Sequence, residues 1–173
     1  KWSRLLEDGF QPQIEVIVED HAQEGLEISI LGHEIREVLI NLFYNAVDAM
    51  PDGGKLKITI SPIENGSLSI QIKDTGVGIT EDKIDKIFDR FFTTKGAKGT
   101  GLGLATSKEI IEKHHGSLKV ESKTDPENHG TAFILQLPVK ATSPHSSESL
   151  STKSQRILIV DDESNVREIL EDI

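Results

Sequence analysis

Residues 33–50 place apolar side chains at the spacing of an amphipathic helix, and a polar row runs along the same stretch. Glu37, Asn41 and Asn45 follow one another at intervals of four residues, so on a helix they lie one above the other on one side. The Pro-Asp-Gly-Gly sequence at residues 51–54 then ends the helix and turns the chain. We therefore predict one long helix that buries one face against a second layer and carries a row of carboxylate and amide groups.

Short alternating stretches on both sides of this helix predict the strands of the second layer. An Asn-Gly pair at residues 65–66 indicates a hairpin, and Thr80 is placed to cap a short helix that runs to about Phe88. Another helix is predicted over residues 102–114, with Gly116 ending it. Their order favours one mixed sheet with helices on one face. The predicted strands are residues 14–19, 26–31, 55–61, 68–73, 117–122 and 130–137.

Two glycine-rich segments follow the long helix. Asp-Thr-Gly-Val-Gly at residues 74–78 comes after a predicted strand, and Gly-Thr-Gly-Leu-Gly at residues 99–103 opens a predicted helix. Glycine lets the backbone approach a phosphate, and the free N–H groups at the start of a helix can bind one. Each segment alone also fits a plain turn or hinge. Beside a row of hard oxygen donors, however, the two segments outline a nucleotide and Mg²⁺ site.

The composition argues against several other classes of protein. The net charge is −10 and the pI is near 5.0, which disfavours nucleic-acid binding through a broad basic surface. The chain has no Cys, so it holds neither a disulfide nor a thiolate metal site, and no apolar run is long enough to cross a bilayer. The chain starts without Met, and we expect a cytoplasmic fragment of a longer protein that makes no direct membrane contact. Whether that parent is membrane-anchored is left open.

The order of these motifs resembles the catalytic, ATP-binding domain of bacterial sensor histidine kinases, within the wider family of gyrase, Hsp90 and MutL. The resemblance covers about residues 10–139. It implies a Bergerat-type, two-layer α/β sandwich with a mixed, mainly antiparallel sheet and helices on one face. It also implies a transferase of two-component signal transduction that binds Mg·ATP and donates the γ-phosphate to a histidine. That histidine would lie on an upstream dimerisation domain absent from this chain, so the fragment would bind nucleotide without efficient autophosphorylation.

The resemblance assigns roles to individual residues. Asn45 would bind Mg²⁺, while Glu37 and Asn41 are candidates for orienting the reacting groups, with Asn41 beside the phosphates. Asp74 would accept a hydrogen bond from the exocyclic amine of adenine, which guanine lacks at that edge. No residue is named as certainly catalytic, and the expected cofactors are ATP and Mg²⁺. The expected nucleotide-binding residues are Asn41, Asn45, Asp48, Asp74, Gly76, Gly78, Ile79, Lys95, Thr100, Gly101, Leu102, Gly103, Leu104 and Thr131.

The sequence Phe-Asp-Arg-Phe-Phe-Thr-Thr-Lys, from Phe88 to Lys95, resembles the phenylalanine box that anchors the ATP lid of these kinases. Phe88, Phe91 and Phe92 would hold the base of the loop, while Arg90 and Lys95 would offer cations to the phosphates. Many relatives carry proline at the position of Arg90, so Lys95 is the stronger candidate. The alternative is an aromatic core patch beside a solvated basic loop.

The composition changes toward the end of the chain. Residues 140–155 are rich in Ser and Thr and predict a flexible linker. Residues 156–173 resemble the start of a response-regulator receiver, with Asp161 and Asp162 as its acidic pair, and they end before the acceptor aspartate. The parent would then be a hybrid kinase that forms a homodimer. Its partners would be its own phosphoacceptor domain and a receiver or response regulator. The expected domains are residues 1–139 (with 1–13 either included or the end of an upstream segment), 140–155 and 156–173.

Two other functions stay open at this point. One is an ATP-hydrolysing machine of the gyrase or MutL kind, in which a glutamate four residues before the metal asparagine activates water. Here that position is Asn41, a poor base, and Glu37 lies one turn further away. The other is a nucleotide-sensing module without phosphotransfer. His33-Glu34 looks like a phosphoacceptor motif, but no proline follows, so we interpret it as the start of the helix.

Overall fold

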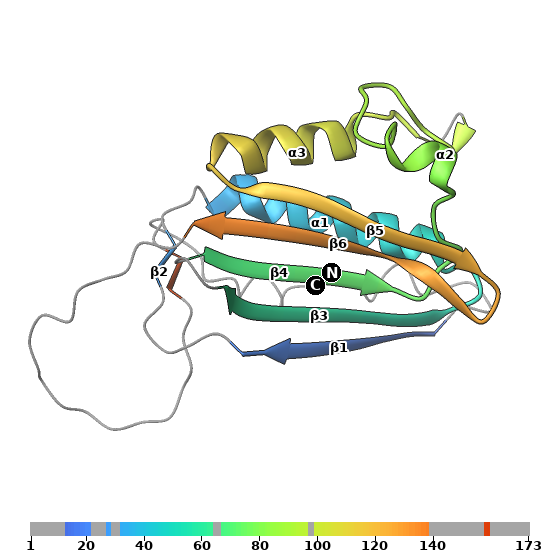
Figure 1. The fold of residues 1–173 in the computed structure, drawn as a ribbon, viewed down its shortest axis with the longest axis horizontal. Helices are drawn as coiled ribbons and strands as arrows, with labels where there is room; N and C mark the ends of the chain where they lie inside the picture. The colour runs from blue at the N-terminus through green and yellow to red at the C-terminus, as the bar shows by residue number, and fades with distance from the viewer. Residues whose placement is uncertain are drawn as a thin grey trace, which may run out of the picture.

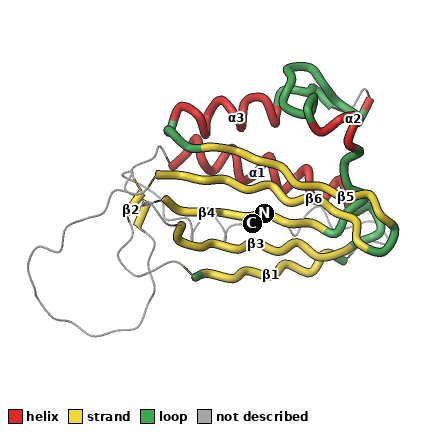
Figure 2. The backbone as a smooth tube through the Cα atoms, in the orientation of Figure 1, coloured by secondary structure: helices red, strands yellow, loops and turns green. Residues whose placement is uncertain are grey.

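The computed structural model describes residues 13–21, 27–28, 32–63, 67–96, 99–138 and 158–159. These residues form two layers, a five-stranded sheet and the helices that cover one of its faces (Figure 1). Figure 2 shows the same arrangement by type, with the long loop before α3 at one end of the helical layer. The predicted α/β class is confirmed.

The sheet is mixed and mainly antiparallel, as predicted. Its order is β1-β3-β4-β6-β5. β1 pairs with β3 in parallel, and the other three pairings are antiparallel. A separate parallel pairing joins β2 (Glu27–Ile28) to β7 (Leu158–Ile159). The strands of the main sheet are β1 (Ile14–Asp20), β3 (Gly54–Ile63), β4 (Ser67–Asp74), β5 (Ser117–Asp125) and β6 (Asn128–Pro138).

Strand alternation decides where the most important carboxylate lies. In β4 the side chains of Leu68, Ile70 and Ile72 are buried, and the residues between them are more exposed. Because side chains alternate between the two faces of a strand, Asp74 continues the buried series and ends on the face that the helices cover. An acidic side chain thus reaches the interface of the two layers at the end of a strand.

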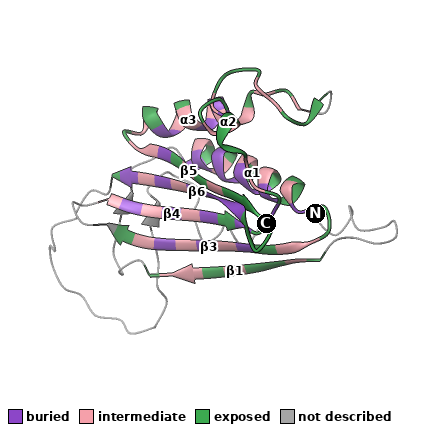
Figure 3. Ribbon diagram, turned by 45° about the vertical axis from the view of Figure 1, so that its right-hand side comes forward, coloured by how far each residue is buried: buried purple, intermediate pink, exposed green. Residues whose placement is uncertain are grey.

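Two helices supply most of the second layer. α1 (Gly32–Ala49) buries one face against β4, and α3 (Gly103–Lys113) packs beside α1 and over β5. Figure 3 shows the buried positions where the two layers meet. The carboxylate of Glu34, at the start of α1, accepts hydrogen bonds from Lys113 and His114 at the end of α3, which ties the helices together. Fully buried core side chains include Ile35, Leu39, Leu42, Ile70, Ile72, Ile111, Leu135 and Leu137.

Several predicted element ends need correction. α2 covers only Glu81–Ile84, because turns replace the helix after it, and the Thr80 side chain makes no capping hydrogen bond to the backbone. Its hydroxyl instead hydrogen-bonds Asp82 and lowers the pKa of that carboxyl. After α3 the left-handed residue is His115, with φ of 59°, rather than Gly116. Gly116 is needed for space, since a Cβ there would lie 2.4 Å from the Gln136 carbonyl oxygen.

Some predictions fall wholly or partly outside the described residues. These are the hairpin turn at residues 65–66, most of the strand at 26–31, the linker at 140–155 and all of 156–173 except β7. Within the described ranges, no helix is both long and apolar enough to span a membrane.

Candidate functional site

The asparagine row of α1 meets the first turn of α3. The side-chain N–H of Asn41 donates to the buried Ser107 hydroxyl over 2.9 Å, which fixes the amide. A Cβ on Gly103 would lie 2.2 Å from Asn41 Oδ1, so only glycine allows this approach. Leu102 precedes the helix and makes no side-chain cap, so the first backbone N–H groups of α3 have no partner within the helix. They form a positive end beside the asparagine row.

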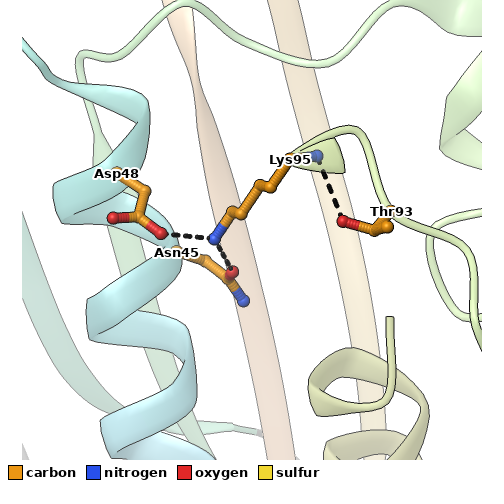
Figure 4. Close-up of polar contacts among 4 residues, drawn as sticks. All are labelled: Asn45, Asp48, Thr93 and Lys95. Carbon is orange, nitrogen blue, oxygen red and sulfur yellow. Dashed lines mark hydrogen bonds and ion pairs between the residues drawn. The ribbon is translucent and has the colours of Figure 1, made fainter. Parts of the chain in front are cut away.

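One turn further along α1, two oxygens converge on a single cation. Asn45 Oδ1 lies 2.8 Å from the Lys95 ammonium and Asp48 Oδ2 lies 2.6 Å from it (Figure 4). The side chains of Lys95 and Asp48 are 39% and 53% exposed, so the cluster is open to solvent. A hard amide oxygen and a carboxylate aimed at one point are the donors that a small divalent cation takes from proteins.

The Asp74 carboxylate is 2% exposed and lies at the other side of the site. Its Oδ1 accepts the backbone N–H groups of Gly76, at 2.8 Å, and Thr131, at 3.1 Å. Both bonds use one oxygen, which leaves Oδ2 with acceptor capacity for a ligand N–H. Burial raises the pKa of Asp74 above its ordinary value, although the two N–H groups act in the opposite direction.

The turn after Asp74 is attached to the end of α1. The Val77 N–H donates to the Ala49 carbonyl over 3.0 Å, and a Cβ on Gly76 would lie 2.5 Å from that same oxygen. Gly78 runs close to β5, where a Cβ would lie 2.0 Å from the Lys123 carbonyl oxygen. The glycines of this segment therefore serve close packing, and they fix Asp74 relative to the asparagine row.

The loop between α2 and α3 is closed at its base. The Phe91 N–H donates to the Gly101 carbonyl over 2.8 Å, and both residues have positive φ, 69° and 66°. A Cβ on Gly101 would lie 2.4 Å from the Phe91 carbonyl carbon, so this crossing requires glycine. The described residues between these two, 92–96 and 99–100, are called the lid below, and this hydrogen bond ties the start of the lid to its end. Thr100 is exposed at its end and accepts a long hydrogen bond, 3.4 Å, from the Leu102 N–H.

Comparison with family models matches residues 31–141 to the family described as "Histidine kinase-, DNA gyrase B-, and HSP90-like ATPase". The match covers more than half of the chain. The chain belongs to this family. Its sequence relatives include sporulation kinases and sensor histidine kinases. Sporulation kinase E of Bacillus subtilis (strain 168) is 44% identical over 108 residues, 62% of this chain and 14% of that kinase. Sensor histidine kinase ZraS of Escherichia coli (strain K12) is 42% identical over 117 residues, 67% of this chain and 24% of ZraS.

Solved structures agree with this assignment. The mycobacterial sensor histidine kinase MprB has a TM-score of 0.64 and 30% identity, covering 73% of this chain and 83% of that one. A catalytic domain of histidine kinase ThkA has a TM-score of 0.63 and 35% identity, covering 72% and 80%. The chain is therefore homologous to the ATP-binding catalytic domain of sensor histidine kinases. It spans only a small part of the two curated relatives above.

Two serines that the sequence analysis did not identify, Ser107 and Ser122, hold other residues of the site in place. Ser122 accepts the Ile79 N–H at 2.8 Å, donates to the Gly130 carbonyl at 2.9 Å and lies 2.9 Å from the Thr131 hydroxyl. The β5–β6 register, which sets Ser122 opposite Thr131, is the signal that reveals it. Ser107 follows Gly103 by one helical turn and holds Asn41.

Other predicted residues lie apart from this cluster. Glu37 is exposed on α1, one turn before Asn41. The Arg90 guanidinium makes two hydrogen bonds to Glu109 on α3 instead of extending over the site. Phe91 closes the loop base through its backbone N–H, but its ring is 73% exposed and its φ is positive, so the expectation that the aromatic side chain holds the base is wrong. The other two aromatic residues of the box, Phe88 and Phe92, pack against the hydrophobic core, and so does Leu104.

Proposed function

We propose that this domain binds Mg·ATP and presents its γ-phosphate to a histidine on a separate phosphoacceptor domain of the parent protein. The observation that carries the proposal is that α1 contacts two other parts of the site. Its amide row meets the uncapped start of α3, and its C-terminal end is hydrogen-bonded to the turn that follows the buried carboxylate of β4. The family match supports ATP as the nucleotide.

The adenine end of the site is assigned to Asp74. Its free oxygen, Oδ2, would accept the exocyclic N–H of adenine, while Oδ1 stays bonded to the backbone. Gly76, Gly78, Ile79 and Thr131 would line this end, held in place by Ser122. A buried acceptor of this kind discriminates strongly, because guanine presents no amine at that edge and would leave it unpaired.

The phosphate end is assigned to α1, the lid and the start of α3. Asn41 and the N–H groups of Gly103 and Leu104 would hold phosphate oxygens, with Thr100, Gly101 and Leu102 beside them. The Asn45 and Asp48 oxygens already face one cation position, so the residues present fit Mg²⁺. Mg²⁺ held there would neutralise charge on the phosphates. Lys95 would add a cation from the lid once it leaves that position.

The proposal extends to the parent protein. Sensor histidine kinases among the relatives suggest a phosphoacceptor histidine domain and a response regulator as partners. We further propose that residues 156–173 begin a receiver domain joined through the linker at residues 140–155, so that the parent is a hybrid kinase. We place its kinase domain in the cytoplasm.

Calorimetry on the 173-residue chain tests the binding half of the proposal. We expect ATP to bind in the presence of Mg²⁺, more weakly with a metal chelator, and GTP to bind far more weakly than ATP. Equal affinities for ATP and GTP would contradict the adenine assignment, and no binding at all would contradict the proposed function.

The raised pKa of Asp74 predicts a pH dependence. In the free folded domain this carboxyl takes up its proton at a higher pH than an ordinary aspartate, whose pKa is about 3.9. The protonated group places an O–H toward a donor amine, so adenosine binding should weaken as the pH falls through this raised value. NMR titration suits the measurement, since adenosine carries no phosphate that titrates in the same range. An affinity that stays constant down to about pH 4 would contradict the role of Asp74.

Glu37→Gln tests the rival function of ATP hydrolysis. Because Glu37 is exposed and a full turn from Asn41, we expect ATP affinity and basal phosphate release to change by less than about threefold, as for a surface substitution. Phosphotransfer, measured in the longer parent, should fall more than basal hydrolysis. Glu112→Gln, exposed on α3, is the matched control. Hydrolysis abolished with ATP binding intact would identify Glu37 as a water-activating base and favour the ATPase.

A further inference from the structure

The lid places its own cation at the position assigned to the metal. The Lys95 ammonium lies 2.8 Å from Asn45 Oδ1 and 2.6 Å from Asp48 Oδ2, and it bridges two residues that lie one helical turn apart (Figure 4). Lys95 is separated from these partners by 50 and 47 residues along the chain. The contact is therefore a tertiary one that joins the middle of the lid to the face of α1.

The lid is shaped to make this contact. The Lys95 N–H donates to the Thr93 hydroxyl over 3.1 Å, which bends the backbone just before the lysine. The Gly99 N–H donates to the Gly96 carbonyl over 3.2 Å, and a Cβ on Gly99 would lie 2.1 Å from Thr93 Oγ1. The lid thus folds on itself, and its base is fixed by the hydrogen bond between Phe91 and Gly101. Such a loop directs Lys95 at a defined point.

An ammonium and Mg²⁺ cannot share this point. Two positive charges within a few ångströms repel each other, and both would need the same amide oxygen. We propose that Lys95 is a latch: in the nucleotide-free domain it holds the lid against Asn45 and Asp48, and Mg·nucleotide releases the lid by displacing the ammonium. This inference rests on the proposed function, because the proposed Mg²⁺ site uses the same two oxygens, Asn45 Oδ1 and Asp48 Oδ2, that bind Lys95 here.

The latch is weak enough to open. Both charged side chains are substantially exposed, at 39% and 53%, and pairs of this kind stabilise a contact only modestly. The released ammonium can then contact the phosphates. Lys95 therefore binds Asn45 and Asp48 in the nucleotide-free domain and the nucleotide afterwards. Salt should loosen the latch, since an exposed pair is screened.

Distance measurements between two spin labels test the latch directly. The chain has no native Cys, so Thr94→Cys on the lid and Glu112→Cys on α3, both exposed, give two unique labelling positions. We expect a narrow distance distribution in the nucleotide-free chain and a broad, shifted one in Asp48→Asn, which keeps Lys95 but removes its ion pair. Lys95→Met should behave in the same way. Lys119→Met, an exposed lysine on β5, is the matched control and should leave the narrow distribution unchanged.

The same labelled chain separates the latch from the proposed function. Mg²⁺ with a non-hydrolysable ATP analogue should shift the distribution of the unsubstituted chain away from the nucleotide-free one, because Lys95 then leaves Asn45 and Asp48. Identical distributions for the nucleotide-free chain with and without Lys95→Met would overturn the latch. A lid that stays closed although calorimetry shows the analogue bound would overturn displacement. Absence of binding would overturn the proposed function and the release step, while the variants still decide whether the contact holds the lid.

Discussion

Asp74→Asn is expected to abolish adenine discrimination while leaving the fold intact. The Asn carbonyl oxygen can still accept the N–H groups of Gly76 and Thr131, but its NH₂ group then faces the adenine amine, donor against donor. Loss of a hydrogen bond to a charged acceptor costs about 1.5–3 kcal/mol, so we expect ATP affinity to fall by about 10- to 150-fold. Calorimetry with ATP and GTP measures the change.

The stability of this variant provides the control. The pKa of Asp74 is raised in the folded state, so the ionised carboxylate does not stabilise the fold at neutral pH. The free energy of unfolding should increase only as the pH falls and the carboxyl takes up its proton. Asn mimics the neutral form, and the melting temperature should therefore stay the same or rise. Asp85→Asn, at an exposed position, should change neither the preference for ATP over GTP nor the melting temperature. If ATP and GTP affinity fall together, Asp74 is structural.

Asn45→Ala should weaken Mg²⁺-dependent nucleotide binding by about 10- to 100-fold, the scale on which ligand environments change metal affinity. Asn45 supplies an uncharged oxygen at the cation position, and the remaining carboxylate of Asp48 is exposed. Nucleotide binding without metal should change little, because the adenine contact is assigned to Asp74 and Asn45 is assigned only to the metal. Titrations with Mg²⁺ and with a chelator measure both values.

The comparison of the two titrations decides the assignment of Asn45. Asn128→Ala, an exposed amide at the start of β6, is the matched control and should affect neither. An equal loss with and without Mg²⁺ would contradict the ligand role and indicate that Asn45 shapes α1 or contacts phosphate directly.

Local periodicity predicted the parts of the site that lie on regular elements. The four-residue spacing on α1 places Asn41 and Asn45 on one side, and the alternation in β4 carries Asp74 to the covered face. These positions follow from 3.6 residues per turn and from the two-residue period of a strand. The same reasoning gives the layers of the fold, because each element buries only one face.

Contacts across the fold could not be predicted in this way. Ser122 reaches Ile79 and Thr131 only because β5 pairs with β6 in one register, and Lys95 reaches Asn45 only because the lid is closed by Gly101. The outward side chain of Phe91 depends on a positive φ that aromatic residues rarely adopt. Such features are set by tertiary packing, which short-range sequence patterns do not encode.

Phosphorylation of the parent protein tests the central claim most directly. A longer chain that extends upstream of Lys1 through the proposed phosphoacceptor domain would be incubated with γ-labelled ATP and Mg²⁺, and the label's stability in acid and base measured. We predict a label that is lost in acid and kept in base, as phosphohistidine is, and that is strongly reduced in Asp74→Asn at limiting ATP. No label, despite demonstrated ATP binding, would contradict the kinase assignment, and phosphate release would then separate an ATPase from a nucleotide sensor.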